Sequence, residues 1–481
     1  MFFRDKFRTF ASMKEHVTDI LEAFNSLQKK LDSMNEKVDG LETTVHQLTR
    51  ANQRLTKENK HLKQRLSKYE TPKKDSSNSG TPPGKENMKS ETNRRTQSLR
   101  EKSNNPVGGQ LGHEGCTREV VDNPDEIVNH QSNYCTACGA DLSSSERVLD
   151  YTTQEIDIPQ IEPVIREHRH YLKVCSCGCK NRPYAPRGRG GNAVVFGKNV
   201  RALVVYYSVV QCIPYQRMES MLKNVFGIDM SQGTMRNIIQ EARKKSEPAI
   251  ARILEYIKKS KVVGFDESGC YCNGRLDWSW IAQTVYYTLV FRASGRKGQV
   301  LTDMFGDSLE NMIAVTDRHS AYFALNFLDH QICLAHILRE LKYLGEVDEK
   351  QKWSAEMESL LKEAIHTRNE SPGKRIETKS WIERLDNLLD WNLEKLNEKF
   401  RTLRKGLFKC RDYIFKFLED PLVPPTNNSS ERGFRKLKVK NKISGTFRSN
   451  DGADAFFSLH SIVETAAKHE QPLLDGLLAL F

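Results

Sequence analysis

The sequence predicts a multidomain protein with an N-terminal parallel coiled coil, a small cysteine-bearing module, a helical segment and a C-terminal α/β domain. Three observations predict this organisation. Apolar residues follow a heptad repeat at the N-terminus, cysteines gather in two short clusters, and strand-like runs end in aspartate. With 481 residues the chain exceeds the usual size of one compact domain, so several structural units are expected.

Charge and composition exclude several classes of protein. Lys and Arg number 74 against 62 Asp and Glu, and the net charge of +12 favours a polyanionic partner. No apolar run approaches the ~18 residues of a membrane helix, and the start, MFFRDKFRTF, lacks the apolar core of a secretory signal. We therefore expect a cytoplasmic protein without membrane contact. In that compartment eleven cysteines indicate metal ligands or free thiols rather than disulfides.

An unbroken heptad repeat within residues 1–70 predicts the coiled coil. One series is Val17, Phe24, Leu31, Val38, Val45, Asn52, Asn59 and Leu66, and the other is Ile20, Leu27, Met34, Leu41, Leu48, Leu55, Leu62 and Tyr69. The side-chain amides of Asn52 and Asn59 would lack hydrogen-bond partners on an apolar surface, whereas across a two-stranded seam each can pair with its counterpart. A parallel homodimer follows. The alternative is a long amphipathic helix folded back on its own protein.

A basic linker rich in Ser, Asn, Pro, Gly and Lys, residues 71–105, leads to the cysteine module, residues 106–190. The module has two cysteine knuckles separated by strand-like sequence. They are Cys135 and Cys138 in CTACG, and Cys175, Cys177 and Cys179 in VCSCGC. Such pairs suit a tetrahedral four-thiolate zinc site. We choose Cys135, Cys138, Cys175 and Cys177 as its ligands, with Cys179 in reserve and His168 and His170 as alternates. A set of free thiols without metal is the competing interpretation.

Residues 191–258 have a helical pattern. Gly227 predicts the end of one helix and Ser231 the N-cap of the next, which is the spacing of a helix-turn-helix. We expect a DNA-binding segment here, although any helical hairpin has the same pattern.

In residues 259–481 the spacing of apolar residues changes from a helical period to that of short strands. Three consecutive strands, a helix, a further buried strand and then alternating helices and strands indicate an α/β domain of the ribonuclease H type. Asp266 lies within the first strand and Asp317 follows the fourth, so both carboxylates can reach one pair of metal ions. Glu431 is the third candidate, because Asn428, Ser429 and Ser430 can cap the helix that carries it. Each acid taken alone could equally be a capped or solvated carboxylate.

A strongly basic stretch follows Glu431. Its cations are Arg432, Arg435, Lys436, Lys438, Lys440, Lys442 and Arg448. An acid within such a segment can hold metal while its neighbours hold phosphates, so we expect the first six of these residues to bind DNA.

Several blocks of this sequence resemble transposases of the IS66 insertion-sequence family. They are KDSSNSGTPPGKEN, GGQLGHEG, CTACG with VCSCGC, IPYQRMESMLKNVFGIDMSQGT, GFDESG, AVTDRHSAYFAL, ICLAHILREL and PTNNSSERGFRKLKVKNKISGTFRS. The resemblance implies a ribonuclease H-like catalytic domain whose acidic triad is Asp266, Asp317 and Glu431. It also implies a helical insertion at about 338–420. Two features depart from the family pattern: Ser268 stands in place of Thr, and the second cysteine knuckle is tighter.

The resemblance also implies a function. It is that of a transposase that cleaves the ends of an insertion sequence and joins them to target DNA with two Mg²⁺ or Mn²⁺ ions, close to the nucleoid. Cys333 and His336 look like a family pair, which we interpret as structural. Double-stranded DNA, a second copy of the chain and accessory proteins of the same element are the expected partners. The alternatives are a non-catalytic, dimeric zinc and helix-turn-helix regulator with a decayed nuclease fold, and a metal-dependent nuclease without strand transfer.

Overall fold

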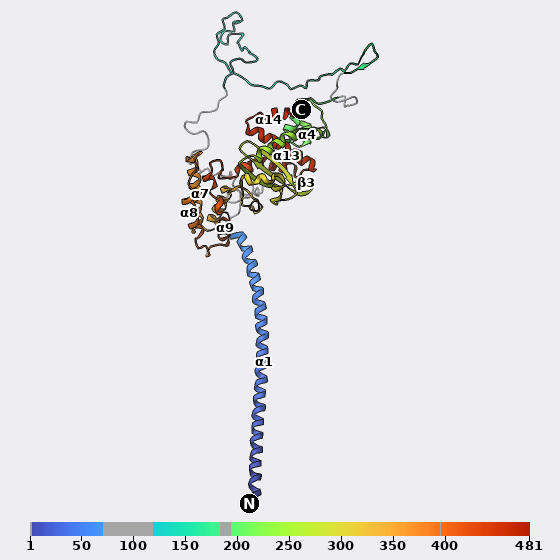
Figure 1. Cartoon of the computed structure of the whole chain (residues 1–481). Helices are drawn as coiled ribbons and strands as arrows, with labels where there is room; N and C mark the ends of the chain where they lie inside the picture. Colours follow the sequence, from blue (N-terminus) through green and yellow to red (C-terminus); the bar gives the residue numbers. More distant parts are fainter. Residues whose placement is uncertain (1, 71–118, 183–193, 395) are drawn as a thin grey trace. The chain divides into compact units, whose positions relative to one another are not determined.

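The computed structural model describes residues 2–70, 119–182, 194–394 and 396–481 (Figure 1). The chain divides into an N-terminal unit, dominated by one helix, and a larger body. The predicted linker, residues 71–105, lies outside the described residues. Among the described helices, none combines the length and apolar character that a membrane span requires.

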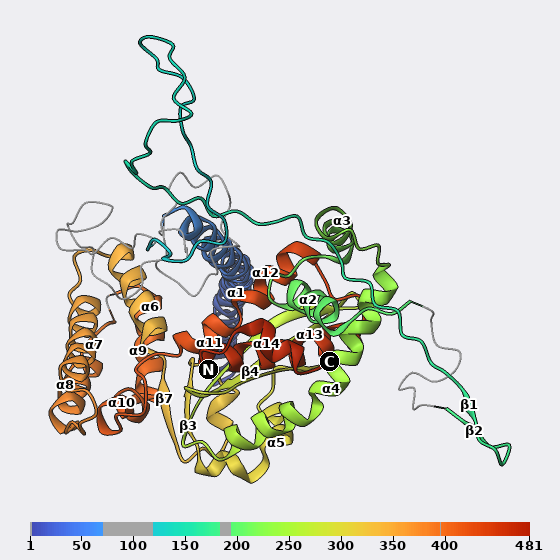
Figure 2. The same ribbon diagram turned by 90° about the horizontal axis from the view of Figure 1, so that it is seen from above.

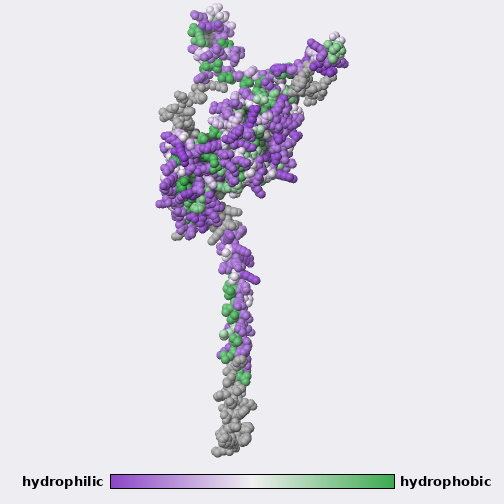
Figure 3. Space-filling model, viewed as in Figure 1, coloured by the Kyte–Doolittle hydropathy of each residue, from purple (hydrophilic) through white to green (hydrophobic). Residues whose placement is uncertain are grey.

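Helix α1, Phe2–Glu70, confirms the predicted N-terminal helix and contains the whole heptad repeat without a break. Along the part of α1 that is coloured in Figure 3, apolar side chains follow one side and form a green stripe. These side chains are largely exposed, from 51% at Leu31 and Val38 to 65% at Leu41. Exposed apolar surface on this scale favours association with another helix. The parallel dimer itself stays a prediction.

The described part of the cysteine module, residues 119–182, has little regular structure. Strand β1, Lys173–Val174, pairs antiparallel with β2, Lys180–Asn181. Polar and apolar residues alternate in the sequence between the two knuckles, which suggests strands. Apart from β1, however, the described segment forms none. Ile156 is 65% and Ile158 is 76% exposed. Because neither face of the segment is buried, no packing selects a strand conformation there.

Three helices precede the sheet: α2, Lys198–Val209, α3, Tyr215–Phe226, and α4, Gln232–Lys258. The predicted end of α3 and the predicted start of α4 are confirmed. Gly227 ends α3 with φ 64°, a left-handed conformation that glycine adopts without strain. Ser231 caps α4, because its Oγ accepts a hydrogen bond from the Thr234 N–H at 3.2 Å.

A five-stranded sheet follows, with the order β5-β4-β3-β6-β7. Its strands are β3, Val262–Cys272, β4, Arg275–Gln283, β5, Thr288–Ala293, β6, Ile313–Thr316, and β7, Asp329–Ile332. The first three are antiparallel, whereas β6 lies parallel to β3 and β7 parallel to β6. Short helices α5, Gln299–Phe305, η2, Gly306–Asn311, and η3, Tyr322–Ala324, join the strands. The predicted strand pattern is thus present.

Alternate side chains of β3 bury themselves in two different cores. Val263 and Phe265 pack with Leu301 and Phe305 of α5 on one face. Cys270 and Cys272 lie on the opposite face, in a core shared with α2–α4 and the C-terminal helices. Those helices are α13, Asn450–Lys468, and α14, Leu473–Leu478. Figure 2 shows the sheet between these layers. The helices before the sheet therefore share a core with it.

A helical insertion separates β7 from the last acidic residue. It comprises α6, Leu334–Val347, α7, Trp353–Glu370, α8, Lys379–Leu389, α9, Glu398–Lys409, η4, Arg411–Tyr413, and α10, Lys416–Glu419. Buried Arg368 bonds the carbonyl groups of Phe417 and Leu418 and so joins α7 to α10. The chain then returns to the sheet with α11, Asn428–Gly433, and α12, Arg435–Ser444.

Candidate active site

Asp266 and Asp317 lie on neighbouring parallel strands. Gly264 of β3 pairs with Val315 of β6, so two residues further along Asp266 and Asp317 are level with each other. Backbone groups orient both carboxylates. The N–H of Glu267 donates to Asp266 Oδ1 at 2.9 Å, and the N–H of His319 donates to Asp317 Oδ1 at 2.8 Å. The order of the sheet therefore brings together two acids that are distant in sequence.

The electrostatics of Asp266 show that the third predicted acid also lies nearby. Burial raises the pKa of Asp266 well above its usual value, and three neighbouring carboxylates raise it further. They belong to Glu267, Asp317 and Glu431. The three predicted acids therefore lie within electrostatic range of one another, but among the described residues their oxygen atoms do not all come within 4.8 Å of one another. A cluster of carboxylates that repel one another fits a hard divalent cation, which prefers oxygen ligands and cancels the repulsion.

Helix α11 carries Glu431 and is bound to the sheet by buried polar side chains. Asn427 Nδ2 donates to the carbonyl oxygen of Phe265 at 2.7 Å, directly before Asp266 in the chain. Ser430 Oγ donates to Asn427 Oδ1 at 2.5 Å and accepts from Gln283 Nε2 at 3.2 Å. These bonds set the position of Glu431 relative to β3.

The predicted capping of α11 is wrong. Asn428 is the first residue of the helix, Asn427 occupies the N-cap position, and no side chain caps there. Ser430 instead uses its hydroxyl group in the contact with the sheet. Tertiary hydrogen bonds, rather than a local cap, hold this helix.

Two glycines allow α11 to approach the sheet closely. A Cβ on Gly264 would lie 2.8 Å from both Asn427 Oδ1 and Ser430 Oγ, and a Cβ on Gly433 would overlap Ile281 Cδ1. Side chains at these positions would push the helix away. Close packing at the two glycines is therefore a condition for the position of Glu431.

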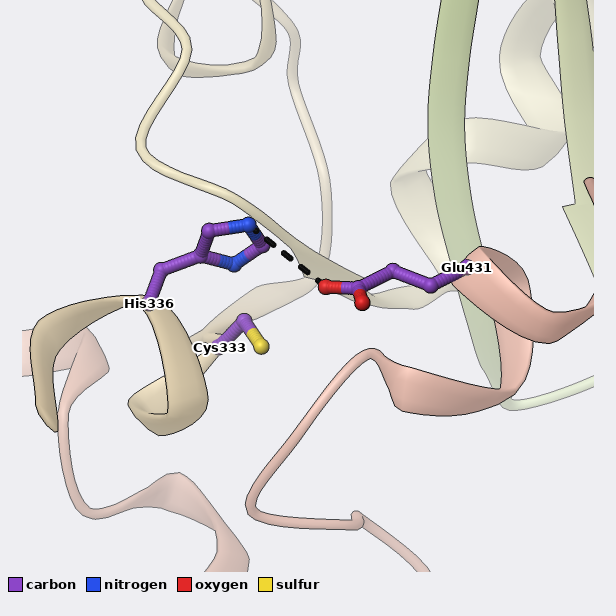
Figure 4. Close-up of side chains that lie close together, drawn as sticks. All are labelled: Cys333, His336 and Glu431. Carbon is purple, nitrogen blue, oxygen red and sulfur yellow. Dashed lines mark ion pairs between the residues drawn. The ribbon is translucent and has the colours of Figure 1, made fainter. Parts of the chain in front are cut away.

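Glu431 also faces the first turns of α6 (Figure 4). Its Oε1 lies 3.2 Å from Arg339 Nη2 and 3.5 Å from His336 Nε2. Cys333, Glu431 and His336 bring a sulfur, an oxygen and a nitrogen within 4.8 Å of one another. Such a mixed donor set suits zinc better than magnesium. His336 Nδ1 is buried without a hydrogen-bond partner among the described residues.

Glu267 is a functional candidate that sequence reasoning missed. Its side chain is 1% exposed and forms an ion pair with Arg296, whose Nη2 lies 2.6 Å from Oε1. The Tyr322 hydroxyl donates to Glu267 Oε2. The signal was the Asp-Glu pair in GFDESG. In a strand adjacent side chains face opposite sides, so the side chain of Glu267 lies on the other face of β3 from that of Asp266. Its carboxylate nevertheless raises the pKa of Asp266.

The six predicted DNA-binding cations do not share one environment. Lys436 forms an ion pair with Glu464 at 2.8 Å. Lys440 packs over the Phe456 ring at 5.9 Å, and burial lowers its pKa. The remaining four are exposed: Arg432, Arg435, Lys438 and Lys442. Spacings of three and four residues put Arg435, Lys438 and Lys442 on one face of α12.

Each cysteine knuckle is a tight turn closed by a glycine with positive φ. The N–H of Gly139 donates to the Cys135 carbonyl oxygen at 2.9 Å, and the N–H of Gly178 donates to that of Cys175 at 2.8 Å. Cys138 and Cys177 each directly precede their glycine. They also lower the pKa of Cys135 and Cys175, respectively, by hydrogen bonding. The described residues do not gather the four thiols into one cluster.

The chain belongs to the IS66 family of transposases. That family's model matches residues 193–455, more than half of the chain, and spans the sheet, the insertion and all three acids. Residues 15–99, which include most of α1, are similar to the initiation control protein YabA. No curated protein matches the chain.

Proposed function

We propose that this transposase has a ribonuclease H-like catalytic domain with an acidic triad of Asp266, Asp317 and Glu431. The observation that carries the proposal is that Asp317, at the end of β6, and Glu431, on α11, both lie close enough to Asp266 of β3 to raise its pKa. The mixed order of the sheet, with three antiparallel strands beside two parallel ones, supports the fold assignment.

The triad residues would hold two Mg²⁺ or Mn²⁺ ions. These ions supply activation of the attacking oxygen and stabilisation of the leaving oxygen. Asp266 and Asp317 remain oriented by their bonds to backbone N–H groups. One strand is hydrolysed at each end of the element, and the freed 3′-hydroxyl attacks the target DNA directly. No covalent link between protein and DNA is involved, so no Ser or Tyr nucleophile is required.

One structural zinc ion completes the metal content of the proposal. Its ligands are Cys135, Cys138, Cys175 and Cys177. The matching position of Cys138 and Cys177 before a glycine, together with the interaction of Cys175 with Cys177, supports Cys177 over Cys179.

Double-stranded DNA is the proposed substrate. The exposed cations of α11 and α12 would bind its phosphates, while Lys436 and Lys440 would support the helix from the protein side. Residues 191–258 would contribute further DNA contacts. The exposed apolar stripe of α1 would pair two copies of the chain and so hold two DNA ends together. Accessory proteins of the same element would be further partners.

A second candidate is a DNA-binding regulator with a decayed nuclease fold, favoured by the coiled coil and the cysteine module. Intact acids at all three triad positions argue against it. The third candidate is a metal-dependent nuclease that cuts DNA without joining it to a target.

The test is an excision and integration assay with a marked DNA segment bounded by the flanks of the gene in its source genome. Wild type is compared with Glu431→Gln and with Glu363→Gln, an exposed acid paired with Arg384 in the insertion. Joined products from wild type and Glu363→Gln, but not from Glu431→Gln, are expected. Cut DNA without joined products would favour the nuclease. Bound but uncut DNA with every variant would favour the regulator.

A further inference from the structure

Arg339 is, among the described residues, the cation closest to the third acid of the triad. Its Nη2 donates to Glu431 Oε1 at 3.2 Å, and its Nε donates to the carbonyl oxygen of Ala335 at 3.1 Å. The side chain is 25% exposed. Arg339 therefore lies beside Glu431 with part of its side chain open to solvent.

The frame around Arg339 does not depend on Glu431. The N–H of Asn427 donates to Cys333 Sγ at 3.1 Å, and the N–H of Leu334 donates to the Pro425 carbonyl oxygen at 3.0 Å. These bonds join the start of α6 to the segment before α11. Arg339 thus stays beside the acids even when its own ion pair is broken.

Glu431 has two competing uses. In the described structure its Oε1 interacts with Arg339 and His336. In the proposed reaction the same carboxylate binds a divalent cation, which weakens its attraction for a guanidinium. Within the described part of the chain, Glu431 is the one acid paired with Arg339. Once that pair is weakened, the guanidinium has free donors next to the place where the DNA backbone is cut.

We infer that Arg339 is a metal-dependent phosphate-binding residue, which pairs with Glu431 in the metal-free protein and with a DNA phosphodiester once the acids hold divalent cations. The inference rests on the proposed function and deepens it. A guanidinium suits the exchange because carboxylate and phosphate oxygens fit the same planar donors. The site would then bind the substrate phosphate only after its metal ions are in place. Cys333 belongs to this frame, because its sulfur accepts the hydrogen bond from the Asn427 N–H.

The test measures the salt dependence of DNA binding by the full-length protein. The probe is a fluorescent linear duplex with the sequence that flanks the gene, titrated by anisotropy in EDTA and in Ca²⁺. Wild type is compared with Arg339→Met, Arg339→Lys and Arg384→Met. Arg384 is the matched control, because it is paired with Glu363 in the same insertion. Thermal melts show whether each variant folds.

In Ca²⁺, the slope of log affinity against log salt should be smaller by about 1 for Arg339→Met than for wild type. In EDTA the two slopes should coincide. Arg339→Lys, which keeps the charge, should retain the wild-type slope, as should Arg384→Met. A slope for Arg339→Met equal to that of wild type in Ca²⁺ would overturn the inference, and so would a slope already reduced in EDTA.

A cleavage assay in Mg²⁺ with the same wild-type preparation distinguishes failure of the inference about Arg339 from failure of the proposed function. If wild type cleaves the duplex but the slopes coincide in Ca²⁺, the role of Arg339 is refuted and the proposed function stands. If wild type binds but does not cleave, and the supercoiled form of the same DNA also stays intact, the proposed function fails, and the inference fails with it.

Discussion

The backbone N–H of Asn427 donates a hydrogen bond to the buried sulfur of Cys333 at 3.1 Å. The Asn427 side chain, in turn, bonds the Phe265 carbonyl oxygen next to Asp266. One residue thereby joins the helical insertion, the helix of the third acid and the central strand. Substitutions that move any of these elements should therefore displace the residues of the proposed triad.

Asp266→Asn should stabilise the fold while it abolishes DNA cleavage. The pKa of Asp266 is raised in the folded state, so the stability it contributes below its unfolded pKa of about 3.9 is lost as pH rises through the folded value. Near neutral pH without divalent ions an ionisable acid at this position therefore destabilises the fold relative to a neutral amide. Thermal melts at about pH 7.5 should give a higher Tm for the variant. Asp303→Asn, at an exposed acid, should leave Tm unchanged; a lower Tm for Asp266→Asn would contradict the prediction.

Gly264→Ala should displace α11. The new Cβ would lie 2.8 Å from two buried polar atoms, so we expect a loss of about 1–3 kcal/mol in the free energy of unfolding. DNA cleavage should fall more steeply than stability, because Glu431 moves with the helix. Gly295→Ala is the control, since a Cβ added there would meet no atom within 4 Å and its φ is not positive. Denaturant unfolding and a cleavage assay check both effects, and unchanged cleavage by Gly264→Ala would refute this role.

Arg296→Met should destabilise the domain by leaving Glu267 buried without its partner. Breaking a buried ion pair costs about 3–5 kcal/mol, and because Arg296 is 40% exposed we expect the lower end, about 3 kcal/mol. The double variant Glu267→Gln with Arg296→Met should recover part of that loss. Urea unfolding of the four proteins of this cycle measures the coupling. Additive losses would show that the pair is not coupled.

Leu48→Lys should prevent dimerisation through α1. The substitution puts a charge in the predicted seam, where Leu48 is 64% exposed in the single chain and would be buried in a dimer. Light scattering should give half the wild-type mass. Deletion of residues 1–70 should have the same effect. Thr43→Lys, on the opposite face of the repeat, should keep the wild-type mass, and a Leu48→Lys variant that also keeps it would refute the dimer.

Cys177→Ser should remove the zinc ion, and Cys179→Ser should retain it. The reason is that Cys177, like Cys138, directly precedes the glycine that closes its knuckle. Elemental analysis after dialysis should show one equivalent of zinc less for Cys135→Ser and Cys177→Ser than for wild type. The reverse result for the two positions would make Cys179 the fourth ligand.

Local patterns in the sequence were sufficient for much of this structure. The heptad repeat predicted α1, Gly227 and Ser231 marked the turn between α3 and α4, and aspartates at the ends of apolar runs marked the triad strands. Each of these features depends on residues close together in the chain, so periodicity and capping rules apply to them directly.

Contacts between distant segments required the tertiary structure. The sequence could not show that Lys436 faces Glu464, that Glu267 pairs with Arg296, or that Arg339 approaches Glu431. The predicted cap of α11 failed for the same reason, since Asn427 bonds a carbonyl group 162 residues away. By itself the sequence predicted α1, the turn between α3 and α4, the strands of the C-terminal sheet and the three acids that we propose as the triad. Only the folded chain decided which side chains hold those acids in place, because packing between remote segments leaves no local periodic signal.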